Sequence, residues 1–366
     1  MSAGRGGQPT RVTDLPPHEG NTYLPFAKLI DLEKIDDRTF RSIAPAFAPG
    51  GPVGVGRSYG AHVYMQAAWA ASQTVAPGFQ LHNVSGNFIL AGELNVPFVY
   101  KVHIIRNGRS YCTRIVNVTQ SQGKGICFTC ICSFKTPEHE QINSQNDVNL
   151  YREYASVLGD KKPSDFPEVP GMDLPFYWKR RQDTGLNDEF PGLECRKVDM
   201  SAFNASRHPL ERKQLIFYRT IGELADEPNM HLCAHLFASD RNSLYIVANH
   251  YELGDYFTSM SSLVHTVIIH SPAAALTFGA ANEETSPLDD KSGRWFCMEA
   301  SGSRMSGGRA VYNCRIWNSK GEHVATAMQD GLIRYAQNPK QPTDDELKHL
   351  DAKARKWSGG GRDEKL

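Results

Sequence analysis

Residues 58 to 73 read SYGAHVYMQAAWAASQ, and this stretch sets the plan of the first half of the chain. Its small and apolar side chains recur at helical spacing, at Val63, Ala67, Ala70 and Ala71. Because a helix this rich in alanine can be approached closely by a sheet, we expect strands to pack on it. Four strand-like runs follow, separated by Gly, Asn and Pro turn signals: HNVSGNFIL (82–90), PFVYKVHIIR (97–106), GRSYCTRIVNVTQ (108–120) and KGICFTCICSF (124–134).

The second half repeats this plan over residues 206 to 335. A helical pattern, EPNMHLCAHLFASD (227–240), comes before a second set of strands: SSLVHTVIIH (261–270), RWFCMEASGSRM (294–305), RAVYNCRIWNS (309–319) and EHVATAMQDGLIRY (322–335). Gly108-Arg109 and Gly308-Arg309 occupy matching turns, 200 residues apart. Two copies of one helix-plus-sheet unit, an α+β fold, is the most economical interpretation.

The chain of 366 residues therefore divides into five parts. Pro-rich, polar sequence between the two copies suits a connection across the outside of the molecule. The predicted divisions are a flexible N-terminus (1–22), a first domain (23–135), a linker (136–205), a second domain (206–338) and a C-terminal tail (339–366).

Charge and hydropathy exclude several functions. Lys plus Arg equals Asp plus Glu at 40 each, so nothing favours binding to nucleic acid or to an anionic membrane. The longest apolar runs are far shorter than the roughly 20 residues of a membrane span, and the N-terminus has no apolar signal core. We expect a protein kept inside the cell, in the cytoplasm. The peroxisome is the close alternative, because the final Glu-Lys-Leu is similar to a Ser-Lys-Leu address.

The eight cysteines mostly lie in apolar runs and are expected to be packed thiols. In the cluster CFTCICSF, strand geometry puts Cys130 and Cys132 on one face and Cys127 on the other, which is a poor arrangement for a tetrahedral metal site. We expect no metal and no cofactor.

A polar residue interrupts the apolar pattern of the last strand, HVATAMQDGLIRY (323–335). By strand alternation, Gln329 shares its face with the small residues Ala325 and Ala327. That face therefore has room for a further group.

These segments together resemble acyl-CoA thioesterase II, the family of bacterial TesB and peroxisomal thioesterases. The resemblance rests on residues 81–134 for the first domain, on SYGAHVYMQAAWAA for its helix, and on SLVHTVIIH and VATAMQDGLIRY for the second domain. The family helix usually begins with Gly-Gly, and here the second position is Ala61. The resemblance implies a double hotdog fold, in which one continuous antiparallel sheet wraps two long central helices.

The resemblance also implies hydrolysis of fatty acyl-CoA by a held water. Matched motif by motif, the family's Asp, hydroxyl and Gln fall on Asp240, Ser262 and Gln329. The chemistry is sound, because an Asp can act as general base while the other two orient the water toward the thioester carbon. Partial burial that raised the Asp pKa from its ordinary value near 3.9 would help. Backbone N–H groups for the oxyanion can come from the Gly60-Ala61 region or from the helix leading to Asp240.

One position departs from the family pattern. The family His is usually preceded by an Asp, and here His265 is preceded by Val264 and followed by Thr266. His265 and His270 are interpreted as packing residues, because a His on an apolar strand more often has a structural role.

Other interpretations remain open at this point. An Asp before Arg-Asn-Ser can simply cap a helix or close a turn, a lone strand Gln usually faces solvent, and hotdog domains also serve as hydratases or as acyl-thioester binding modules. No Gly-x-Ser-x-Gly elbow supports an α/β-hydrolase, and GGPVGVG (50–56) lacks the Lys of a P-loop. Lys179-Arg180-Arg181 can meet the CoA phosphates or form a solvated face. A homodimer through exposed sheet edges is expected.

Overall fold

The structure is a computed structural model, and it describes residues 24–49, 57–94, 96–120, 125–139, 141–146, 149–185, 190–279 and 293–335. The predicted N-terminal segment (1–22), the C-terminal tail (339–366) and the Gly-rich run 50–56 lie outside these residues. No helix among the described residues has the length and apolar character needed to cross a membrane.

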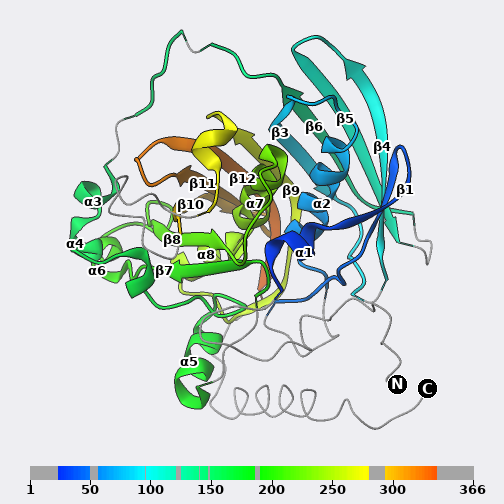
Figure 1. Cartoon of the computed structure of the whole chain (residues 1–366). Coiled ribbons are helices and arrows are strands. Elements are labelled where there is room, and N and C mark those ends of the chain that lie inside the picture. Colours follow the sequence, from blue (N-terminus) through cyan, green and yellow to red (C-terminus); the bar gives the residue numbers. More distant parts are fainter. Residues whose placement is uncertain are drawn as a thin grey trace, which may run out of the picture.

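The main element is one antiparallel sheet. Strands of the first half are β1 (Leu32–Asp36), β2 (Thr39–Ser42), β3 (Gln80–Phe88), β4 (Phe98–Asn107), β5 (Tyr111–Gln120) and β6 (Ile126–Lys135). Strands of the second half are β7 (Leu193–Lys197), β8 (Gln214–Thr220), β9 (Phe257–Ile269), β10 (Phe296–Ser306), β11 (Arg309–Trp317) and β12 (His323–Tyr335). Within the described residues the sheet has twelve strands, in the order β1-β2-β4-β5-β6-β3-β9-β12-β11-β10-β8-β7 (Figure 1).

This order confirms the predicted repeat. The two halves mirror each other about the central pair β3 and β9, which joins them into one continuous sheet. At that seam Ser85 lies opposite Thr266, and their hydroxyl oxygens are 2.9 Å apart. The turn at Gly108 connects β4 to β5, and the turn at Gly308 connects β10 to β11. The offset of 200 residues therefore relates equivalent turns.

Helices α2 (Gly60–Ser72), α7 (Pro228–Ser239) and α8 (Ser243–His250) lie on the inner face of the sheet, whereas α5 (Pro175–Thr184) lies apart from it (Figure 1). The helices are α1 (Phe26–Ile30), α2 (Gly60–Ser72), α3 (Leu150–Glu153), α4 (Ala155–Leu158), α5 (Pro175–Thr184), α6 (Ser201–Asn204), α7 (Pro228–Ser239) and α8 (Ser243–His250). Helix α2 covers the strands from β3 to β6, α8 covers β10 to β12, and α7 packs on α2 and β3. With 13 and 12 residues, α2 and α7 are of ordinary length rather than long.

The alanine-rich face of α2 explains the close approach of the sheet. Ala67, Ala68, Ala70 and Ala71 are completely buried. At the far end, the buried guanidinium of Arg114 on β5 donates to the carbonyl and the hydroxyl oxygen of Thr74, both at 2.8 Å. A cation at this end also suits the helix dipole. Helix α2 is thereby fixed on the sheet, with its N-terminus toward the second half.

The segment predicted as a linker adds structure to the second half. Its residues form β7, which pairs with β8, and the short helices α3, α4 and α6, which contribute to a second apolar core around Trp295 and Trp317. The hydroxyl of Tyr154, which follows α3, donates to buried Glu299 on β10 at 2.8 Å. The domain boundaries given above remain a prediction.

All eight cysteines are free and buried, as expected for packed thiols. The prediction for Cys127 is wrong in one detail: its side chain is buried like those of Cys130 and Cys132. The cause is a bulge, because the register with β5 shifts at Cys127 and strand alternation is interrupted there.

Candidate active site

A cleft of about 610 Å³ lies where the two halves meet. Its walls come from the first turn of α2, the turn between α7 and α8, the residues just after β3, and the first part of β9. Asp240 and Ser262, two of the three residues predicted to hold a water, line it.

Asp240 caps the C-terminus of α7, at the turn into α8. Asn242 turns the chain there with a left-handed φ of 65°, so that α8 starts at Ser243. One carboxylate oxygen of Asp240 accepts a bond from the Ser243 hydroxyl at 2.9 Å. The other accepts a bond from the Ala61 N–H of α2 at 3.2 Å. Asp240 therefore closes a turn, as one of the open interpretations of the sequence predicted. It also faces the first turn of α2 across the cleft.

The environment of Asp240 suits it to act as a base. Its side chain is buried, and burial raises the pKa of the carboxyl from 3.8 to about 6. Hydrogen bonds from Ser243, Gln329 and the Ala61 N–H work in the opposite direction and limit the rise. A carboxyl with this pKa is ionised at neutral pH and is a stronger base than an ordinary Asp.

Gln329 and Ser262 meet on the inner face of the sheet. Gln329 on β12 is completely buried, and its amide donates to the Ser262 hydroxyl on β9. Ser262 lies opposite Gly331, so Gln329 meets it on the side away from Ala325 and Ala327. The contact depends on a bulge, because Asp330 pairs with Val264 whereas Gly331 pairs with Ser262, which leaves Leu263 as the extra residue.

The structure thus brings Asp240, Ser262 and Gln329 to one place, with Gln329 contacting both of the others. Val264, the departure from the family pattern, lies opposite Asp330 on the outer face, where Arg309 pairs with Asp330 at 2.9 Å. A carboxylate at position 264 would point away from the three residues.

Two residues of the site were missed from the sequence. Ser243 binds the Asp240 carboxylate, and only its spacing of three residues from Asp240 hints at the contact. Arg241 is buried and donates to the carbonyl oxygens of Pro170 and Gly171, at 2.7 and 2.9 Å. These long-range bonds fix the segment at Gly171, which lines the cleft, and no local sequence pattern predicts them.

The helix leading to Asp240 cannot supply oxyanion donors. Asp240 lies at the C-terminal end of α7, which presents carbonyl groups, and the free N–H groups of the first turn are about 18 Å away along the axis. The first turn of α2 has the required polarity. Its Ala61 N–H already binds Asp240, which leaves Gly60 as the candidate donor.

Replacing Gly60 with Ala tests the close approach of α2 and Asp240. An added Cβ would lie 3.1 Å from a carboxylate oxygen of Asp240 and 3.1 Å from the Phe88 ring. We expect Gly60→Ala to displace the carboxylate. If so, kcat for the acyl-CoA hydrolysis that the resemblance implies should fall by about 10-fold to 10²-fold, with little change in the thermal unfolding temperature. Unchanged steady-state kinetics would contradict this packing.

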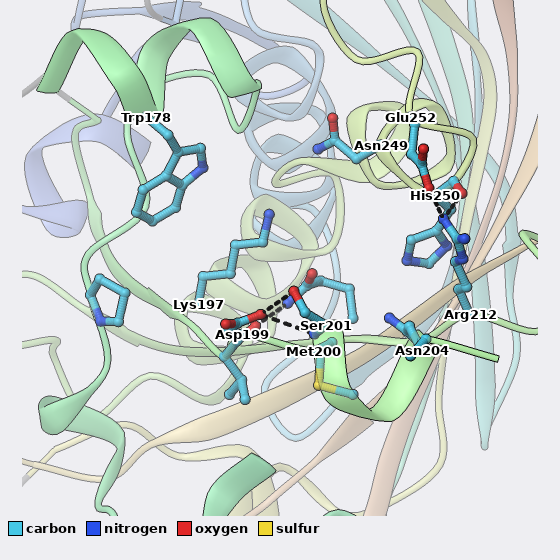
Figure 2. Close-up of a pocket in the computed structure, with 14 residues that line it drawn as sticks. Trp178, Lys197, Asp199, Met200, Ser201, Asn204, Arg212, Asn249, His250 and Glu252 are labelled. Carbon is cyan, nitrogen blue, oxygen red and sulfur yellow. Dashed lines mark hydrogen bonds and ion pairs between the residues drawn. The ribbon is translucent and has the colours of Figure 1, made fainter. Parts of the chain in front are cut away.

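A second hollow, of about 580 Å³, lies beside Trp178, Lys197 and His250 (Figure 2). Its charged groups already have partners, since Lys197 pairs with Asp173 at 2.7 Å and Asp199 accepts a bond from the Ser201 hydroxyl at 2.6 Å. None of the three candidate residues lines it. The cleft at Asp240 is therefore the better candidate active site.

Comparison with known proteins shows the family. Residues 49–135 match the model of the acyl-CoA thioesterase N-terminal domain, and residues 181–333 match that of the acyl-CoA thioesterase C-terminal domain. These matches cover more than half of the chain. The chain belongs to the acyl-CoA thioesterase family and is a thioester hydrolase by class.

Individual relatives agree with this assignment. The chain is 24% identical to acyl-CoA thioesterase 2 of Haemophilus influenzae over 319 residues, which are 84% of this chain and 96% of that protein. It is 24% identical to human acyl-coenzyme A thioesterase 8 over 325 residues, with 87% and 91% covered. The crystal structure of acyl-CoA thioesterase II TesB2 from Mycobacterium marinum has a TM-score of 0.61 and 23% identity, over 85% of this chain and 99% of that one. This likeness supports the hotdog fold.

Proposed function

We propose that this protein hydrolyses fatty acyl-CoA thioesters to a free fatty acid and CoA, using a water held by Asp240, Ser262 and Gln329. The observation that carries the proposal is a buried carboxylate of raised pKa in the cleft, beside Ser262, which also lines the cleft, and the completely buried Gln329 that donates to Ser262. Membership of the acyl-CoA thioesterase family supplies the substrate class.

In the first step, Asp240 removes a proton from the water while the water oxygen attacks the thioester carbon. The Ser262 hydroxyl and the Gln329 amide orient that water. The carbonyl oxygen becomes an oxyanion, which the Gly60 N–H and the positive end of α2 stabilise. The carbon–sulfur bond then breaks, and the thiolate of CoA takes the proton from Asp240. The carboxylate is regenerated.

The walls of the cleft suit an acyl chain. Phe88, Leu90, Phe257, Met260 and Leu263 line it with apolar surface. Arg57 also lines the cleft and is exposed, so it is available to the CoA phosphates. Arg181, one of the three basic residues at 179–181 considered for the CoA phosphates, forms an ion pair with Glu168 at 3.6 Å.

The rate should depend on pH through Asp240. The base must be ionised, and its pKa is raised to about 6. We therefore expect kcat to be low at pH 5, to rise through pH 6 and to level off above pH 7. Stopped-flow thiol release in overlapping buffers measures this. A profile flat down to pH 4.5 would contradict the assignment of Asp240 as base.

Thiol release from acyl-CoAs of different chain lengths tests the function itself. We expect release from medium or long acyl-CoA. Binding without release would favour an acyl-thioester binding module, and a change in an enoyl chromophore would favour a hydratase.

The homodimer and the cytoplasmic location remain predictions, which light scattering and cell fractionation would check.

A further inference from the structure

Leu244 is a buried apolar residue that the proposed reaction does not use, and it lies among the candidate catalytic residues. It occupies the first turn of α8, directly after Ser243, whose hydroxyl donates to the Asp240 carboxylate at 2.9 Å. Its side chain lines the cleft together with Asp240 and Ser262, yet it is only 4% exposed. Leu244 therefore borders the space in which the thioester carbon is attacked.

A glycine on the sheet fixes the position of the Leu244 side chain. A Cβ added at Gly331 would lie 2.3 Å from one methyl carbon of Leu244 and 2.8 Å from the other, so the side chain packs directly on the backbone of β12. Gly331 pairs with Ser262 on β9, and side-chain positions in such a pair are about 5 Å apart. The methyl groups of Leu244 consequently lie on the same part of the inner face as Ser262.

Beyond Ser262, an apolar groove follows β9. Met260 and Phe257 line the cleft on the part of β9 that extends past its pairing with β3, which ends at Val264. Both side chains are partly buried and pack against the apolar core, so they share the inner face of the sheet with Ser262. Because a strand rises about 3.3 Å per residue, the groove from Ser262 to Phe257 is on the order of 15 Å long. It offers an acyl chain a path out of water.

The two sides of the cleft differ in exposure and charge. Arg57, Ile89 and Leu90, from the first half, are exposed, whereas the lining from α8 and β9 is buried or partly buried. Arg241 also lines the cleft, but its guanidinium donates to backbone carbonyl oxygens and lies 3.9 Å from the centre of the Phe190 ring. The phosphates of CoA need water or a cation, whereas an acyl chain is stabilised by burial. CoA therefore fits the open side at Arg57, and the acyl chain fits the groove along β9.

We propose that the acyl chain leaves the thioester carbon along β9, and that Leu244 rejects acyl groups whose carbon next to the carbonyl carries a methyl branch toward it. This inference rests on the proposed function, and it narrows the substrate class to chains without that branch. Leu244 cannot retract to make room, because Ser243 ties its helix end to Asp240 and Gly331 lies directly behind its methyl groups. A closely packed wall of this kind discriminates by shape.

The two enantiomers of a 2-methyl acyl-CoA give a matched test, because their thioesters have equal intrinsic reactivity toward water. We expect wild type to hydrolyse the enantiomer whose methyl group faces Leu244 about 10-fold to 10²-fold more slowly than the unbranched substrate, measured as kcat/KM by thiol release. Leu244→Ala should raise kcat/KM for that enantiomer by about 10-fold and leave the other enantiomer within about 3-fold of wild type.

Gly331→Ala tests the same contact from the sheet side. The added methyl group displaces the Leu244 side chain toward the cleft, so kcat/KM should fall by about 10-fold even for the unbranched substrate. Combining Gly331→Ala with Leu244→Ala removes the clash and should restore kcat/KM to within about 3-fold of Leu244→Ala alone. The double variant also refills the space behind position 244, so it provides the test if Leu244→Ala alone does not fold.

The control and the contradicting results are distinct. Ile89→Ala, on the open side of the cleft, should leave the ratio between the enantiomers unchanged. The same ratio in wild type and in Leu244→Ala would overturn the inference, while thiol release from unbranched acyl-CoA would leave the proposed function standing. Additive losses in the Gly331→Ala and Leu244→Ala pair would also overturn it.

Binding to a variant that lacks the base tests the inference without turnover. In Asp240→Asn, calorimetry with each intact enantiomer measures Kd directly. We expect the disfavoured enantiomer to bind about 10-fold more weakly than the other, and Leu244→Ala in the same background to remove the difference. Equal Kd values for the two enantiomers would overturn the inference, whether or not the wild type hydrolyses acyl-CoA.

Discussion

Replacing Asp240 with Asn is expected to lower kcat for acyl-CoA hydrolysis by about 10²-fold to 10⁴-fold, the range that a general base contributes. Asn has nearly the same shape and can still accept the Ala61 N–H bond, but it cannot take a proton from water. KM should change little, because the carboxylate contacts the water rather than the acyl chain. Thiol release at substrate saturation measures the effect. Asp330→Asn, on the outer face of β12, is the matched control and should retain full activity.

The same variant should be more stable than the wild type at high pH. The folded-state pKa of Asp240 is raised from 3.8 to about 6, so the folded protein binds this proton more tightly than the unfolded chain does. The stabilisation that this preference provides is complete below pH 3.8 and is lost as pH rises through about 6. Asn avoids the cost of a buried charge, which corresponds to about 3 kcal/mol at pH 8. Denaturant unfolding at pH 8 and pH 4 measures the free energy of unfolding of Asp240→Asn relative to wild type. We expect the variant to be more stable at pH 8 and to lose this advantage at pH 4. An equal loss of stability at both pH values would contradict the expectation.

Replacing Gln329 with Ala is expected to lower kcat by about 10²-fold and to move the acid limb of the pH profile upward. The amide orients the water, and its bond to Asp240 lowers the pKa of that carboxyl. Steady-state thiol release from pH 4.5 to 8.5 measures both effects. Met328→Ala, the exposed neighbour on the outer face, is the control. A variant with wild-type kcat and an unmoved limb would remove Gln329 from the reaction.

Much of the fold could be predicted from the sequence because its signals are local. The alanine stripe of α2 and the alternating strands from β3 to β6 and from β9 to β12 follow from residue spacing alone. The short strands at the two ends of the sheet, β1, β2, β7 and β8, were not predicted. Strands β2 and β8 depend on pairing with the distant strands β4 and β10, and the edge strands β1 and β7 pair with β2 and β8 in turn.

The site was harder to predict because it depends on a break in alternation. Ser262 and His265 are three residues apart, so a regular strand would direct them to opposite faces. The bulge at Leu263 turns both inward, and a single sequence does not reveal a bulge. Family resemblance indicated Asp240, Ser262 and Gln329, whereas the contact of Ser243 comes only from the packing of the helix ends.

The central claim is that a water, rather than a carboxylate of the protein, attacks the thioester. A single turnover in ¹⁸O-labelled water, with enzyme in excess over acyl-CoA, tests it by mass spectrometry of the released acid and of the peptide that contains Asp240. The account predicts ¹⁸O in the fatty acid from the first turnover and none in Asp240. Label in Asp240 together with unlabelled first-turnover acid would show a covalent acyl intermediate and would contradict the account.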